Sequence, residues 1–143
     1  NYDKWAAYSQ SKVANLLFAY ELQRRLEAIN AKTISVGAHP GYAATNLQQA
    51  GPKMEGARLQ SLIMGILNRI VAQDAASGVR PQLYAATAPA VNGCDYIGPG
   101  GFRESRGYPK KIKSSDLSYD RQTAARLWQV SEDLTGVHFL SGE

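Results

Sequence analysis

The hydrophobic and polar residues from position 5 to about position 30 recur with the period of an α-helix. Alanine, a strong helix former, is frequent in this stretch. The apolar positions fall three and four residues apart, at Val13, Leu16, Leu17, Tyr20 and Leu26. A solvent-facing side is expected from Glu21, Gln23, Arg24, Arg25 and Glu27. This pattern predicts one long amphipathic helix, for which Asn30 is a plausible end.

A short strand is predicted next. Residues 33–39 are partly β-branched and are followed by Pro40 and Gly41, which indicates a strand buried in a sheet. A long helix feeding such a strand is half of a parallel α/β unit. Ligands bind at the carboxyl ends of parallel strands, so we expect the turn at Pro40 and Gly41 to face a ligand. An ordinary structural turn is the alternative.

Residues 59–71 carry a second apolar stripe at helical spacing. It consists of Leu59, Leu62, Ile63, Ile66, Leu67, Ile70 and Val71. The stripe predicts a helix whose apolar side packs in a core. A helix lying on a membrane surface is another option, for which Arg58 and Arg69 supply only a short basic flank.

The following segment predicts a shorter helix and a strand. Asp74 or Ser77 can cap a helix that Pro89 ends, and Pro81 falls near its start, where a missing amide does least harm. Residues 93–100 are expected to form the final strand, leaving through a glycine turn.

The carboxyl-terminal residues predict a closing helix. A polar linker is expected at 114–118, followed by a helix over 119–135 with Gly136 as its C-terminal cap. The candidates for its packed positions are Ala125, Leu127, Trp128, Val130 and Leu134. Residues 114–143 are therefore expected to form a helix and tail, and no second domain is expected in residues 1–143.

Composition narrows the class of protein. A chain of 143 residues, 44% hydrophobic and 20% charged, can bury a core of its own. No apolar run approaches the roughly 18 residues of a membrane span, so no stable membrane insertion is expected. Cys94 is the only cysteine, which fits a reducing, cytoplasmic location, and we expect it to be a small buried residue. His39 and His138 are far apart in sequence, and no metal site is expected.

The positive charge does not by itself indicate nucleic acid. The net charge is +4, and the densest basic cluster, residues 103–113, is short and rich in Gly and Pro. It contains no nucleic-acid-binding motif, so no nucleic-acid partner is expected. We interpret the cluster as a solvated loop, with anion binding as the lesser option.

Tyr8 and Lys12 are the candidate catalytic residues. They are four residues apart near the start of the long helix, and this spacing places both side chains on one face. An ammonium near a phenol favours the phenolate and lowers a pKa that is ordinarily about 10. The pair could therefore act as a general acid/base on an alcohol or carbonyl. Such pairs also occur on many helices where the ring packs and the amine is solvated.

The combined motif closely resembles a known family. Tyr8 and Lys12, then Pro40 and Gly41, then Thr45 follow the pattern of the carboxyl-terminal half of the short-chain dehydrogenases/reductases. Residues 7–16, with His39 before Pro40, look most like the retinol-dehydrogenase-like branch. The resemblance implies an α/β fold, the carboxyl-terminal half of a Rossmann-type, doubly wound parallel sheet in three layers.

The resemblance also assigns roles. It implies that Tyr8 is the catalytic acid/base and contacts the cofactor, which is NAD or NADP, and that Lys12 bonds the nicotinamide ribose. Pro40, Gly41, Ala43 and Thr45 would cover the nicotinamide, although Thr45 could instead be a helix cap. The implied substrate is a small-molecule alcohol or carbonyl compound. Residues 46–73 would be a substrate-side insertion that suggests an apolar substrate or a mobile lid. A homo-oligomer through residues 5–30 is also implied.

Parts of the family pattern are missing from the printed sequence. It contains no Gly-x-x-x-Gly-x-Gly phosphate loop, and the family's catalytic serine would precede position 1. The chain thus resembles the back part of a longer protein, and we expect the 143 residues alone to be inactive. The alternatives to an oxidoreductase are a catalytically incomplete fragment and a non-catalytic cofactor-binding or scaffold protein with the same fold.

Overall fold

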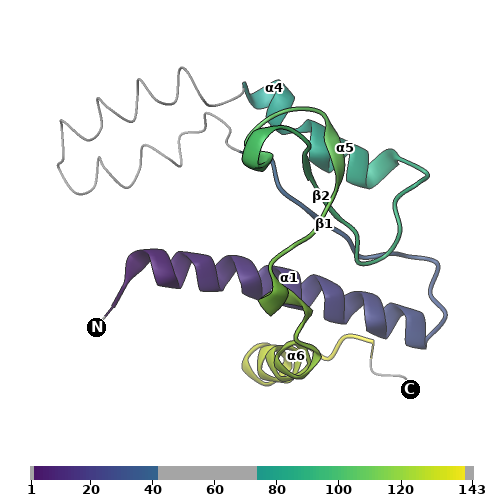
Figure 1. Ribbon diagram of the computed structural model, residues 1–143. Coiled ribbons are helices and arrows are strands. Elements are labelled where there is room, and N and C mark those ends of the chain that lie inside the picture. Colours follow the sequence, from purple (N-terminus) through teal and green to yellow (C-terminus); the bar gives the residue numbers. More distant parts are fainter. Residues whose placement is uncertain (1, 42–73, 141–143) are drawn as a thin grey trace. The chain divides into compact units, whose positions relative to one another are not determined.

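The computed structural model describes residues 2–41 and 74–140 of the chain (Figure 1). Its elements are α1 (Lys4–Ala28), β1 (Gly37–Ala38), α4 (Ala75–Gly78), α5 (Arg80–Thr87), β2 (Tyr96–Pro99), η1 (Phe102–Glu104), β3 (Pro109–Ile112), η2 (Asp116–Tyr119) and α6 (Arg121–Thr135). The chain divides into two compact units. The first comprises Asn1–Gly37, Ala90–Tyr96 and Lys113–Glu143, and the second comprises Ala38–Pro89 and Ile97–Ile112.

Helix α1 confirms the predicted long helix. Asp3 caps its start, because one carboxylate oxygen accepts the N–H groups of Trp5 at 2.8 Å and Ala6 at 3.1 Å. The helix ends at Ala28, and Asn30 just beyond it has a left-handed φ of 52°. The expected stop at Asn30 therefore lies within two residues of the observed end.

Two polar residues of α1 were expected on its solvent side and are buried instead. Glu21 is 8% exposed and Gln23 is 4% exposed. Each has partners that compensate for burial: Glu21 forms ion pairs with Arg24 at 2.8 Å and Arg25 at 2.9 Å. Gln23 accepts the N–H of Ser35 at 2.6 Å. Periodicity does not predict this burial, because a polar side chain can be buried when partners from other positions satisfy its hydrogen bonds.

Helix α6 packs beside α1 in the first unit (Figure 1). Asp120 caps its start, and Gly136 ends it with a left-handed φ of 67°, which confirms the predicted cap. Ala124 and Trp128 are its buried residues. Two expected packed positions are wrong: Ala125 is exposed, and Leu134 is 82% exposed.

Trp128 joins the two helices of this unit. Its ring stacks on Phe18 of α1 with centroids 4.9 Å apart, and Arg25 lies 4.5 Å from its centroid. The indole N–H donates to Glu132 at 2.8 Å. The core of the first unit consists of Leu17, Tyr20, Leu26, Val91, Ala124 and Trp128.

The segment 114–118, expected to be a polar linker, is partly a buried turn. Ser114 and Ser118 are buried, and their hydroxyls lie 2.6 Å apart. The Tyr20 hydroxyl from α1 lies 2.9 Å from that of Ser114. Burial raises the pKa of Tyr20 to about 12, although the hydrogen bond between Tyr20 and Ser114 acts against this shift. The hydroxyl groups of these residues bond to one another and not to water, which allows this polar segment to be buried.

The described strands form one sheet in the order β1-β2-β3. Gly37 donates to Asp95 and His39 donates to Ile97, so β1 and β2 run in the same direction. Gly100 donates to Tyr108 and Gly101 to Arg106, so β2 and β3 form an antiparallel hairpin. The α/β fold class is confirmed, and the sheet is mixed.

The strand predictions need two corrections. The expected strand 33–39 is assigned only at Gly37–Ala38, and Ile34 before it is exposed. The basic cluster 103–113 was expected to be a solvated loop, but it contains η1 and β3, so β2 is not the final strand. In the hairpin, backbone hydrogen bonds hold β3 while the side chains of Lys110 and Lys111 stay exposed. A charged sequence can therefore form a strand at the edge of the sheet.

Helices α4 and α5 belong to the second unit. Asp74 caps α4 by accepting the Ser77 N–H at 2.7 Å, so Asp74 and not Ser77 is the cap. Pro81 lies in the first turn of α5, as expected, and the helix stops at Thr87 before Pro89. The predicted stripe of residues 59–71 and the insertion 46–73 lie outside the described residues. Among the helices that the structure describes, none combines the length and apolar character needed to cross a membrane.

Candidate functional site

Tyr8 and Lys12 lie together on α1, as their spacing predicts. The Lys12 ammonium is 5.3 Å from the centroid of the Tyr8 ring. The Ser11 hydroxyl donates to the carbonyl of Tyr8 at 2.7 Å within the same helical turn. Tyr8 is 50% exposed, so its phenol can be reached from solvent. A cation beside an accessible phenol can assist proton exchange with a bound alcohol or carbonyl.

The surroundings of this pair are open in the described part of the chain. Tyr2 and Trp5 at the start of α1 are also exposed. The buried residues of α1 begin only at Leu17. The first turns of the helix thus present an uncovered aromatic surface, which a flat ring could contact.

Pro40 and Gly41 form the turn expected after β1. Gly41 has a φ of 71°, and a Cβ atom placed there would lie 2.5 Å from the Ser105 carbonyl oxygen and 2.7 Å from Pro99. Only glycine fits this position without strain or displacement. Tyr8 and Lys12 belong to the first unit and Pro40 and Gly41 to the second. Ala43 and Thr45, the other predicted cofactor contacts, lie outside the described residues.

His39 precedes this turn, and the sequence analysis assigned it no role in shaping the turn. Its Nδ1 accepts the N–H of Gly41 at 3.1 Å. Burial lowers the pKa of His39, and Glu104, whose carboxylate lies 3.7 Å from Nε2, acts against that shift. The sequence contains a signal for this hydrogen bond. His39 has an acceptor nitrogen and stands two residues before the turn glycine, which is the spacing at which Asn and Asp side chains accept a backbone N–H.

Cys94 is half-buried and has a left-handed φ of 62°. Burial raises the pKa of its thiol, and the nearby Glu27 carboxylate adds to this effect. A thiol with a raised pKa carries little thiolate at neutral pH, which agrees with the expectation of an unreactive residue. Among the described residues, no three His, Cys, Asp or Glu side chains are grouped as a metal site would require.

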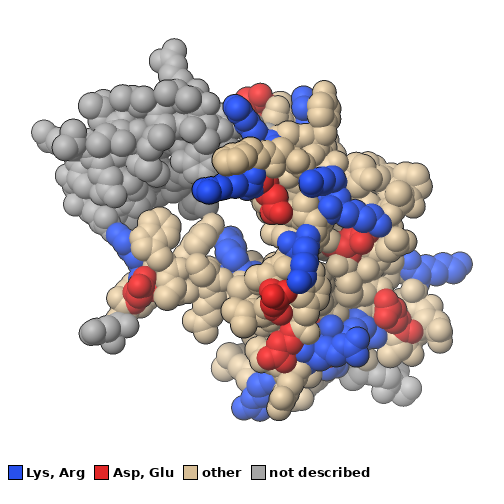
Figure 2. Space-filling view, viewed as in Figure 1, with Lys and Arg blue, Asp and Glu red and all other residues tan. Residues whose placement is uncertain are grey.

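Basic and acidic side chains are mixed on the described surface. Figure 2 shows red acidic side chains standing among the blue basic ones on the face drawn. In the basic cluster, Arg103 lies over the ring of Phe102. Arg80 likewise lies over the ring of Tyr108. These arginines therefore have aromatic partners within the protein.

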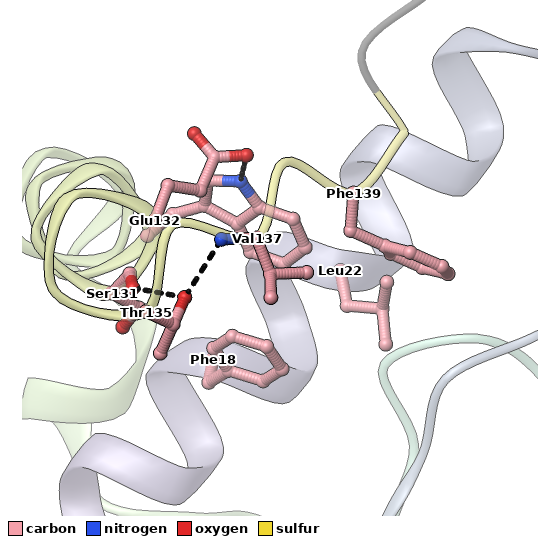
Figure 3. A pocket seen from close by; sticks show the side chains of 8 residues that line it. Phe18, Leu22, Ser131, Glu132, Thr135, Val137 and Phe139 are labelled. Atoms are coloured by element: carbon pink, nitrogen blue, oxygen red, sulfur yellow. Dashed lines mark hydrogen bonds between the residues drawn. The ribbon is translucent and has the colours of Figure 1, made fainter.

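An apolar pocket of about 420 Å³ lies between α1, α6 and the segment after α6 (Figure 3). Its lining residues are Phe18, Leu22, Trp128, Ser131, Glu132, Thr135, Val137 and Phe139. Phe18 and Leu22 follow Tyr8 on the same helix by about 15 and 21 Å, at about 1.5 Å per residue. Direct proton transfer from Tyr8 into this pocket is therefore excluded, and the pocket is separate from the acid/base pair.

No family model matches the chain, but individual proteins resemble it. It is 32% identical to human retinol dehydrogenase 14 over 96% of this chain and 37% of that protein. It is also 32% identical to the short chain dehydrogenase/reductase dpmpH of Macrophomina phaseolina, over 87% of this chain and 57% of that protein. The chain thus spans about a third to a little over a half of these two relatives.

A solved structure shows the same fold. The crystal structure of an uncharacterised protein from Mycobacterium paratuberculosis superposes with a TM-score of 0.68 at 36% identity. It covers 97% of this chain, which corresponds to 42% of that protein. The structural match supports the fold, and the sequence relatives show that the chain belongs to the short-chain dehydrogenase/reductase superfamily and to its retinol-dehydrogenase-like branch.

Proposed function

We propose that Tyr8 and Lys12 are the acid/base pair of an NAD(P)-dependent oxidoreductase that interconverts an alcohol and a carbonyl compound. The observation that carries the proposal is the Lys12 ammonium 5.3 Å from the ring of an accessible Tyr8. Relatives with dehydrogenase names support oxidoreductase chemistry at the level of the family. The chain spans only part of these relatives, so the activity is proposed for the full-length protein.

The proposed role of Tyr8 is proton transfer. In oxidation, the Tyr8 phenolate takes the hydroxyl proton of the alcohol, and in reduction the phenol returns a proton to the carbonyl oxygen. A bound nicotinamide would supply the hydride acceptor or donor. The Lys12 ammonium stabilises the phenolate through its positive charge.

The proposed cofactor contacts come from two segments. Lys12 would donate hydrogen bonds to the ribose, and the turn at Pro40 and Gly41 would lie against the nicotinamide, with Ala43 and Thr45 beyond it. The glycine at position 41, which no larger residue could replace, supports close packing of the backbone at this turn. The exposed phenol of Tyr8 leaves space for a ring to approach. These features fit a nicotinamide cofactor, and NAD and NADP both remain candidates.

The proposed substrate is a small alcohol or carbonyl compound of apolar character. The support is the similarity to a retinol dehydrogenase, because retinol is a largely apolar alcohol. We also propose, from the family resemblance, that α1 pairs between two copies of the protein. Size-exclusion chromatography with light scattering measures this association, and a strictly monomeric full-length protein would contradict it.

Substitution of Tyr8 by Phe tests the catalytic proposal. Tyr8→Phe in the full-length protein should reduce turnover by about 100-fold or more, the usual worth of a positioned acid/base, and cofactor binding should largely persist. Tyr108→Phe is the matched control, because Tyr108 is also exposed and lies over Arg80. Normal turnover by Tyr8→Phe would reject the role.

A non-catalytic protein is the second candidate. The 143 residues contain no Gly-x-x-x-Gly-x-Gly loop, the element that would hold the phosphates of the cofactor. If purified material has a mass of 15.5 kDa, we expect no tight cofactor binding and no activity. Saturable cofactor binding without turnover on a broad panel of alcohols and carbonyl compounds would instead favour a cofactor-binding scaffold.

A further inference from the structure

The imidazole of His39 lies against the backbone of β2. A Cβ atom on Gly98 would lie 2.2 Å from His39 Nε2 and 2.7 Å from its Cδ2, so the ring occupies the space that a side chain at 98 would need. Ile112 of β3 contacts the same site, because its Cδ1 lies 2.4 Å from that Cβ position. The ring is thus held in place by two strands of the second unit.

The same ring reaches the turn that follows β1. His39 Nδ1 accepts the N–H of Gly41 at 3.1 Å, two residues along the chain. Gly41 in turn rests on the loop after β2, since a Cβ there would lie 2.9 Å from the Glu104 carbonyl oxygen and 2.5 Å from that of Ser105. The position of Gly41 is therefore fixed on one side by backbone contact and on the other by the imidazole.

We propose that His39 is a positioning residue for the cofactor-binding turn: its neutral imidazole accepts the Gly41 N–H and holds the left-handed turn at Pro40 and Gly41 in the shape that receives the nicotinamide. The inference rests on the proposed function, because it gives this turn its role. His39 itself does not touch the reacting atoms in this proposal.

The proposal fixes the tautomer and a dependence on pH. A nitrogen that accepts a hydrogen bond carries no proton, so the proton of the neutral ring is on Nε2. Protonation of Nδ1 removes the acceptor. The N–H of the ring then points at the N–H of Gly41, and the two groups repel each other. Within residues 2–41 and 74–140, the charged group recorded beside the ring is Glu104 from η1, whose carboxylate lies 3.7 Å from Nε2. From β2 and β3 the uncharged residues Gly98 and Ile112 lie at the ring.

The direction of the pH effect follows from burial. Burial lowers the pKa of His39 below its usual value of 6.5, and the opposing effect of Glu104 is smaller. A group with a lowered folded-state pKa contributes stability that is present above the unfolded value and lost as pH falls through the folded value. The turn is therefore held at neutral pH and released in mildly acidic solution.

Three substitutions of His39 distinguish the contribution of the hydrogen bond from the contribution of the ring's size. His39→Leu keeps size and removes the acceptor, and a lost hydrogen bond should weaken cofactor binding about threefold to tenfold. His39→Asn places an oxygen near the Nδ1 position, which is the usual side chain in such a bond, and should restore binding. His39→Gln carries its amide one methylene farther out and should behave like His39→Leu.

The measurements are the dissociation constant of the cofactor and steady-state kinetics on the full-length protein. For His39→Leu, KM for the cofactor should rise more than kcat falls, because Tyr8 and Lys12 are unchanged. Cofactor affinity of the wild type should fall as the pH drops through the lowered pKa of His39, and that of His39→Asn should stay constant over the same range. His138→Leu is the control, because His138 is the other histidine and is exposed.

A second measurement does not depend on the cofactor. Long-range proton–nitrogen NMR spectra of the histidine rings should show His39 protonated on Nε2 at neutral pH. The amide signal of Gly41 should shift with the same midpoint as the His39 ring. If these signals appear and the wild type binds no cofactor, the proposed function fails and the positioning of the turn survives.

Other outcomes overturn the inference. Protonation of His39 on Nδ1 at neutral pH would exclude the hydrogen bond. Cofactor affinity in His39→Leu equal to the wild type would show that the bond does not position the turn. Equal loss in His39→Asn and His39→Leu would assign the effect to the ring itself and reject the role of the acceptor.

Discussion

The hydroxyls of Tyr20 and Ser114 lie 2.9 Å apart in the interior of the first unit, although 94 residues separate them in the chain. Ser114 is also 2.6 Å from Ser118, and the Ser114 N–H donates to the Tyr119 hydroxyl at 3.2 Å. The rings of Tyr20 and Tyr119 stack with centroids 5.4 Å apart. Four residues therefore tie the segment before α6 to the middle of α1.

Removing the Tyr20 hydroxyl should destabilise the protein modestly. Tyr20→Phe deletes one buried hydrogen bond, but Ser114 retains its contact with Ser118. We expect a loss of about 0.5–1.5 kcal/mol in the free energy of unfolding at pH 7, measured by urea denaturation. Tyr2→Phe is the control, because Tyr2 is exposed. An unchanged midpoint for Tyr20→Phe would show that this contact contributes nothing.

The same substitution should change the response to alkali. Burial raises the pKa of Tyr20 from 10.0 to about 12, so the unfolded chain loses this proton first. Stability from Tyr20 is therefore complete below about pH 10 and is lost as pH rises towards 12. Denaturation curves at several pH values should show that the free energy of unfolding falls less between pH 10 and 12 for Tyr20→Phe than for the wild type, because the variant lacks the titrating phenol. Identical slopes would contradict the burial of this group.

The two tryptophans should differ sharply in their contribution to stability. Trp128 is 2% exposed and contacts Phe18, Arg25 and Glu132, so Trp128→Ala should lower the free energy of unfolding by about 3–5 kcal/mol. Trp5 is 70% exposed, and Trp5→Ala should change it by less than about 0.5 kcal/mol. Equal effects of the two substitutions, measured by denaturation, would contradict the packing of α6 against α1.

Gly93 should not tolerate a side chain while Gln23 is present. A Cβ at position 93 would lie 2.1 Å from the Gln23 amide carbon, and that amide accepts the Ser35 N–H at 2.6 Å. We expect Gly93→Ala to destabilise the protein by about 1–3 kcal/mol through crowding. In a Gln23→Ala background the same change should cost much less, which a double-mutant cycle measures. An equal cost in both backgrounds would exclude the contact.

Lys12 and Tyr8 should give different kinetic signatures. In the proposed mechanism Lys12 acts on both the phenol and the ribose, so Lys12→Met should lower kcat and also weaken cofactor binding. Tyr8→Phe should lower kcat alone. Lys4→Met is the control, because Lys4 lies at the exposed start of the same helix. If Lys12→Met weakened binding without lowering kcat, Lys12 would act on the cofactor only.

Local patterns predicted the helices well because their signals are contained in neighbouring residues. The apolar spacing of α1, the cap at Gly136 and the turn at Gly41 each depend on a few consecutive positions. The same holds for Tyr8 and Lys12, whose proximity follows from one helical turn. The family motif then added expectations about a cofactor that residue spacing alone does not provide.

The errors arose where distant segments decide the structure. Gln23 was placed in solvent because its partner Ser35 lies beyond the end of the helix. Local sequence predicts a linker at Ser114 and Ser118, because the hydroxyl that pairs with Ser114 comes from distant α1. Strand β3 was missed because its exposed lysines resemble a loop, and only backbone pairing with β2 reveals it. The bond from His39 to Gly41 is local and could have been proposed from the spacing.

Helix α1 is anchored by its second half, where all its buried residues lie from Leu17 onward. Within the described part of the chain, the half with Tyr8 and Lys12 is held by the Asp3 cap and by the helical hydrogen bonds. Amides in such turns open more readily and exchange their hydrogens with deuterium faster than amides over a core. Binding of a ligand at Tyr8 should therefore slow deuterium uptake by the amides in the first turns of α1. This effect can be measured without any catalytic turnover.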